Sequence, residues 1–205
     1  MNSAVSKELK EWREIFGREL KSHLRTLQAD NDIYGFTLAL PENFRELHIV
    51  TGVARESQLK GETAGSTYWL NRRYCPDWDF IGNMNVFPES SGMLSKILSD
   101  YEATFSTHSE SREIRCRDEF HATCLDVMSR CVNNGDFGNI WFRMLHISDS
   151  NLRIVRASFY RLNSGRALKE GAKIYPRFQW LRERIAVVVT PIRIRYTRWK
   201  VGAKR

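Results

Sequence analysis

Apolar residues recur at every third or fourth position in four stretches of the chain, the spacing that places them on one side of a helix. The first stretch predicts an amphipathic helix from about Ser3 to Leu27, with charged residues on its other side. Its apolar positions are Leu9, Trp12, Phe16, Leu20, Leu24 and Leu27. The other predicted helices begin near Pro88, near Arg112, and behind the N-cap candidates Asp149 and Ser150.

Three stretches show the pattern of strands instead. Apolar residues alternate with others over Tyr34–Leu40 and again over Leu47–Val53, which predicts an antiparallel hairpin with a loop of about four or five residues. The apolar run Asn139–Ser148 predicts a further, central strand. The pattern therefore predicts an α+β fold, an antiparallel sheet covered by helices.

The apolar faces of these elements define the expected core. Its predicted members are Trp12, Phe16, Phe36, Leu38, Ile49, Leu125, Trp141 and Leu145. Between Ala54 and Pro88 the periodicity fades, yet the segment carries several aromatic residues, which usually bury most of their surface. This segment is therefore expected to be more than a linker.

Positive charge is concentrated at the C-terminal end of this 205-residue chain. Residues 176–205 hold nine basic residues and one acid, and so they account for the whole formal net charge of +8. In residues 1–175, 23 basic residues are balanced by 23 acids. We therefore expect a neutral α+β domain over residues 1–175 and a basic extension over residues 176–205.

The extension is predicted to form a ribbon with one apolar and one cationic face. Ile185–Thr190 resembles a buried strand, Pro191 interrupts it, and apolar and cationic residues then alternate. The candidate partner-binding residues are Arg193, Arg195, Tyr196, Arg198, Trp199 and Lys200. Guanidinium groups neutralise phosphates and aromatic rings stack on bases, so a nucleic acid is one candidate partner. Alternatively, the arginines keep an exposed edge strand soluble, or they bind an acidic protein.

The sequence shows no pattern of a catalytic, cofactor or metal site. Cys116, Cys124 and Cys131 fall on one face of a predicted helix at spacings too long for a C-x-x-C site, which predicts buried structural thiols, with Cys75 exposed. The histidines lack zinc-binding spacings. Asp136-Phe137-Gly138 matches a kinase triplet without any accompanying kinase motif, so a turn between a helix and a strand is expected there.

Several short motifs together resemble a bacterial family, domain of unknown function 4303. They are Ile33-Tyr34-Gly35-Phe36 at the first strand, Tyr68-Trp69, Gly135-Asp136-Phe137-Gly138, and Ile147-Ser148-Asp149-Ser150. The resemblance covers roughly residues 5–165 and leaves out the basic extension. It implies an α+β domain, and some small bacterial proteins of this type are similar to immunity proteins, which neutralise a cognate toxin. It brings no catalytic residues.

These observations lead to one expected function and two alternatives. The expected function is that of a non-enzymatic, cytoplasmic protein-binding protein, an immunity protein whose partner is an acidic toxin domain. The first alternative is a nucleic-acid-binding protein that acts through residues 176–205. The second is an enzyme with a scattered active site. No cofactor and no membrane segment are expected, because the longest apolar run, Ile185–Val189, is far shorter than a membrane span.

Overall fold

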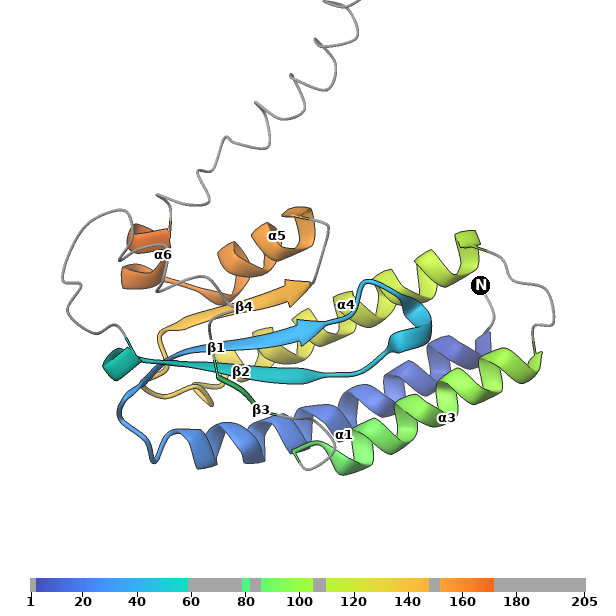
Figure 1. Cartoon of the computed structure of the whole chain (residues 1–205), viewed down its shortest axis with the longest axis horizontal. Helices are drawn as coiled ribbons and strands as arrows, with labels where there is room; N and C mark the ends of the chain where they lie inside the picture. The colour runs from blue at the N-terminus through green and yellow to red at the C-terminus, as the bar shows by residue number, and fades with distance from the viewer. Residues whose placement is uncertain (1–2, 59–78, 82–85, 105–109, 148–151, 172–205) are drawn as a thin grey trace, which may run out of the picture. The chain divides into compact units, whose positions relative to one another are not determined.

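The computed structural model describes residues 3–58, 79–81, 86–104, 110–147 and 152–171 (Figure 1). The chain divides into two compact units, residues 1–167 and 168–205. Of the second unit only residues 168–171 are described, so the sheet and the helices packed on it belong to the first. The predicted domain boundary near residue 175 and the predicted ribbon lie outside the described residues.

Four of the helices agree with the predicted periodicity, and the short helix that follows them was not predicted. The helices are α1 (Ser3–Leu27), α3 (Pro88–Thr104), α4 (Glu110–Asn133), α5 (Leu152–Leu162) and the short α6 (Gly165–Gly171). Two single turns of 3-10 helix, η1 (Phe44–Glu46) and η2 (Glu56–Gln58), flank the second strand. The α+β prediction is confirmed in this respect.

The sheet has four strands in the order β3-β2-β1-β4. They are β1 (Ile33–Leu40), β2 (Val50–Arg55), β3 (Asp79–Ile81) and β4 (Phe142–Ile147). Antiparallel pairing joins β1 to β2 and β2 to β3, whereas β4 runs parallel to β1. The predicted purely antiparallel sheet is therefore wrong: the sheet is mixed.

The direction of β4 follows from the long connection through α3 and α4. The chain leaves α4 and enters the sheet at the end where β1 begins, and there the Trp141 amide donates to the Tyr34 carbonyl at 3.1 Å. From this entry point β4 must run alongside β1 in the same direction. Strands joined by a short loop pair antiparallel, as β1 and β2 do, but this rule does not apply to strands joined by such a long crossover.

Two predicted strand boundaries also shift. The hairpin loop spans residues 41–49 because η1 forms inside it, with the Asn43 side chain accepting the Arg45 amide at 3.1 Å. Leu47 and Ile49 are buried all the same, which explains why they resembled strand positions. At the other strand, turn hydrogen bonds occupy residues 135–140, so that β4 begins only at Phe142.

The core lies between the sheet and the layer formed by α1 and its neighbours α3 and α4 (Figure 1). Trp12 and Phe16 of α1 stack at 4.8 Å between ring centroids and reach Phe120 of α4 and Phe87 beside α3. On the sheet side, Phe36 meets the edge of Phe137 at 5.6 Å.

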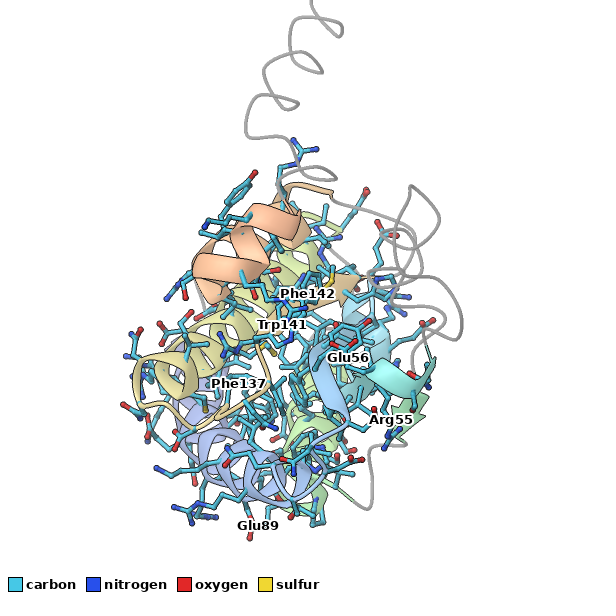
Figure 2. All side chains as sticks on the ribbon, turned by 90° about the vertical axis from the view of Figure 1, so that its left-hand side faces the viewer. Arg55, Glu56, Glu89, Phe137, Trp141 and Phe142 are labelled. Atoms are coloured by element: carbon cyan, nitrogen blue, oxygen red, sulfur yellow. The ribbon has the colours of Figure 1, made fainter. Side chains whose placement is uncertain are left out.

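Of the predicted core residues, only Trp141 is not buried to the expected degree. It lies immediately before β4, and its half-buried ring stacks on Tyr34 on one side, while the Arg166 guanidinium lies 4.2 Å from its centroid. Its neighbour Phe142 points edge-on to it and is fully buried (Figure 2). The indole is thus covered in part by the buried Tyr34 and in part by the exposed Arg166.

A carboxylate of α1 fixes the start of α3. Glu19 accepts the backbone amides of Glu89 and Ser90, both at 3.0 Å, and the Ser90 hydroxyl. The first amides of a helix have no partner within it, so this side chain serves as the cap. The Trp12 indole donates to the Ser90 carbonyl at 3.1 Å, which fastens the same turn a second time.

Candidate functional site

The candidate partner-binding residues of the basic extension, residues 193–200, lie outside the described residues. The described residues therefore place none of them, and the predicted ribbon stays a prediction. The sites that the structure does place are the 135–138 turn, the three thiols of α4, two histidines of the helix layer and a cluster of charges between helices; Cys75 lies outside the described residues.

The turn at residues 135–138 has the structural role expected for it. Gly135 ends α4 with φ 75°, and the amides of Gly135 and Asp136 donate to the carbonyls of Val132 and Cys131, the pattern of a glycine-terminated helix. The Asp136 carboxylate pairs with Lys21 of α1 at 3.0 Å. The resemblance to a kinase triplet thus has a purely conformational explanation.

The helix face that carries three cysteines is only partly buried. Cys124 and Cys131 are buried, as predicted, whereas Cys116 is half-buried. Burial raises the pKa of all three thiols, that of Cys131 to about 11, which favours the protonated thiol over the thiolate. Among the described residues no group of three or more His, Cys, Asp or Glu side chains is placed to hold a metal ion.

Two histidines lie in the helix layer. His121 of α4 is buried, and its Nε2 lies 3.0 Å from the Pro41 carbonyl, which can only accept, so Nε2 carries the proton. His23 of α1 contacts Phe87 edge-on. Burial lowers the pKa of both side chains, although the Pro41 hydrogen bond opposes this at His121. Both are therefore neutral packing residues at pH 7.

Three arginines from three helices converge on one carboxylate, and we call this set the arginine cluster: Arg13, Arg130 and Arg161, with Asp126 at its centre. Arg13 of α1 lies 2.9 Å from Asp126 Oδ2, Arg161 of α5 lies 3.0 Å from Oδ1, and Arg130 lies 3.6 Å from Oδ2. Glu14 of α1 is a second, more exposed acid, 3.3 Å from Arg130. The arrangement connects α1, α4 and α5.

Local structure explains how the helices bring these side chains together. Arg13 follows the buried Trp12 and so lies at the border of the apolar face of α1. Asp126 and Arg130 are one turn apart on α4, the spacing at which helix side chains meet. Arg161 is the basic residue in the last turn of α5, where a cation interacts favourably with the helix dipole.

The charges of the cluster do not balance. Among the described residues, three guanidinium groups face the two carboxylates of Asp126 and Glu14, so positive charge is in excess within this set. The side chains of Arg130 and Arg161 are about half exposed, at 49% and 50%, while Arg13 and Asp126 are more enclosed. The Nε of Arg13 is buried and lies 3.9 Å from Glu14 Oε1, and it has no hydrogen-bond partner among the described residues. Such a site has the chemistry to accept a further carboxylate or phosphate in addition to Asp126.

Sequence reasoning missed the arginine cluster because its members come from three separate helices. The spacing of Asp126 and Arg130 was the one signal in the chain, and on its own it indicates only an ordinary surface pair. Within the described part of the chain no helix has the length and apolar character needed to cross a membrane.

Comparison with known proteins places the chain in a family without assigning it an activity. No curated protein and no solved structure matches it. The model of the family described as Domain of unknown function (DUF4303) matches residues 15–164, which include the strands of the sheet, most of the helices and every member of the arginine cluster except Arg13. The chain belongs to the DUF4303 family.

Proposed function

We propose that the protein is a non-enzymatic binding protein that holds an acidic surface of a partner protein against the arginine cluster, as an immunity protein would hold a toxin. The observation that carries the proposal is the convergence of Arg13, Arg130 and Arg161 on the single carboxylate of Asp126.

The three guanidinium groups have more hydrogen-bond donors than the carboxylate of Asp126 can accept. Each has five N–H donors in a rigid plane, and one carboxylate accepts only a few of them. Asp126 and the helix packing orient the arginines in advance, so binding orders less side chain than it would at an isolated arginine. Arginine is also enriched at protein interfaces and among the residues that dominate binding energy. An acidic side chain of a partner therefore fits this surface.

The alternative function is nucleic-acid binding through the basic extension. The observation that favours it is the charge of residues 176–205, nine basic residues against one acid, with Tyr196 and Trp199 between the arginines. This alternative makes a different electrostatic prediction, because it assigns binding to the extension and leaves the arginine cluster without a role.

Two anionic probes of matched charge and three variants separate the proposals. The probes are an oligoglutamate peptide and an oligothymidylate, each titrated against the full chain at several salt concentrations. R130Q/R161Q weakens the cluster, R193Q/R195Q/R198Q weakens the extension, and R25Q/R115Q is the control. Arg25 and Arg115 are exposed arginines of α1 and α4 outside the cluster, and their loss changes the charge as much as that of Arg130 and Arg161.

We expect R130Q/R161Q to bind oligoglutamate roughly tenfold more weakly, the effect of losing charge-assisted hydrogen bonds, and R25Q/R115Q to stay close to wild type. Equal losses in both double variants would reduce the cluster to nonspecific charge and contradict the proposal. Tight oligothymidylate binding that only the triple variant loses would support the alternative instead.

The immunity role needs a separate test in cells. Where a toxin gene adjoins the gene of this protein, co-expression of the two is expected to restore growth. Protection should fail with R130Q/R161Q and persist with R25Q/R115Q. Full protection by both variants would show that a toxin is neutralised through another surface.

A further inference from the structure

Among the described residues, strand β4 lies at one end of the sheet, and one of its two edges has no neighbouring strand in the order β3-β2-β1-β4. In a strand that pairs in parallel, the N–H and C=O groups of one residue point toward one edge of the strand, and those of the next residue point toward the other edge. Met144 faces β1, where its carbonyl accepts the Thr37 hydroxyl, and Arg143 and Leu145 therefore face away from it. Unpaired backbone groups at such an edge invite pairing with a strand of another molecule.

The side chain of Asn163 takes the place of a strand at this edge. Its Oδ1 accepts the Arg143 amide at 2.9 Å, and its Nδ2 donates to the Arg143 carbonyl at 2.5 Å. A carboxamide offers the same donor and acceptor as a peptide unit, so both backbone groups of Arg143 are satisfied. The second Nδ2 hydrogen is donated to the Phe159 carbonyl at 2.8 Å, and this bond also caps the end of α5.

Ser158 covers the next outward-facing residue of the strand. Its hydroxyl accepts the Leu145 amide at 3.0 Å and donates to the Val155 carbonyl of its own helix at 2.7 Å. Asn163 and Ser158 are both buried, and the Phe159 ring between them packs on Phe142 of β4 at 5.8 Å. Figure 1 shows α5 running beside β4, the position that these contacts require.

We propose that Asn163 and Ser158 act as a substitute strand that closes the β4 edge, and that a second copy of this chain pairs along this edge when they are removed. Apolar residues at these two positions could bury the same surface, but they would leave the backbone groups of Arg143 and Leu145 without partners. Asn163 and Ser158 satisfy three backbone groups that would otherwise be available to another strand. This role is independent of the arginine cluster.

The experiment compares N163A/S158A and the single variant S158A with wild type. N139A serves as the control, because Asn139 is exposed and makes one long contact, 3.4 Å to Asn31. Hydrogen exchange at low protein concentration reports the amides of Arg143 and Leu145, with that of Met144 as the internal reference. Light scattering coupled to size exclusion then gives the mass of each variant over a range of concentrations.

We expect the Arg143 and Leu145 amides of N163A/S158A to exchange about tenfold faster than in wild type, with Met144 unchanged, as when one hydrogen bond of each is lost. At higher concentration the double variant should gain mass relative to wild type, and N139A should not. Wild-type exchange at Arg143, or faster exchange without any gain in mass, would overturn the proposal.

The single variant S158A keeps the test decisive if the double variant fails to fold. Serine to alanine changes the volume little and leaves Asn163 in place, so only the Leu145 amide loses its acceptor. Its exchange should accelerate while that of Arg143 stays slow. Unchanged exchange at Leu145 would refute the role assigned to Ser158 and with it the proposed substitute strand.

Discussion

Replacing Phe36 by Ala tests how the helix layer is held on the sheet. Phe36 lies in the central strand β1 with 0% of its surface exposed, 5.6 Å from the Phe137 ring and 6.3 Å from that of His23. Truncation removes the buried ring and leaves a cavity. Strand β1 cannot move to close this cavity, because it is paired with β2 on one side and with β4 on the other. The free energy of unfolding should fall by about 3–5 kcal/mol, the range for such changes.

Urea unfolding followed by circular dichroism measures this loss. The midpoint should fall by roughly 1–3 M with little change in slope. F36L keeps most of the volume and should lose less than about 1.5 kcal/mol. I114A removes a side chain that is 39% exposed on α4, and its effect should stay within about 0.5 kcal/mol. If F36A unfolded at the same midpoint as I114A, the placement of Phe36 in the core would be wrong.

Three further predictions concern pH, the backbone and cross-links. Because burial lowers the folded-state pKa of His121 below 6.5, the unfolded state binds the proton more readily, so stability should fall as pH drops below about 6.5, and H121Q should show a smaller fall in pH-dependent urea titrations. G138A should lower the melting temperature, since φ is 52° and a Cβ would lie 2.9 Å from Gln28; G92A, in α3 with open space, should raise stability by about 0.5–1 kcal/mol. Chelator and reductant together should leave the melting temperature unchanged, and a clear drop would reveal a metal or disulfide.

The helices were predictable because the signals that define them are local. The period of apolar residues in α1 gives its face, and Gly135 marks the end of α4 through a conformation that other residues rarely adopt. The burial of Trp12 and Phe16 follows from that face alone. Such features depend on neighbours within a few residues, all visible in the sequence.

The sheet was predictable only where its pairing is local. The β1–β2 hairpin follows from two alternating stretches close in sequence, but the direction of β4 depends on the path through α3 and α4. The exposure of Trp141 is equally nonlocal, since its ring is flanked by Tyr34 from β1 and by Arg166 after α5. Apolar patterns give the face of an element and leave open which neighbour covers it.

The arginine cluster shows why net charge along a chain does not describe a surface. Residues 1–175 are neutral in total, which from the sequence left the basic extension as the only electrostatic feature. In the fold, Arg13, Arg130 and Arg161 nevertheless meet around Asp126 and leave positive charge in excess at one place. Charges interact over about 10 Å at moderate salt, so a partner senses this local excess and not the total. A domain that is neutral in total can therefore present a local positive surface.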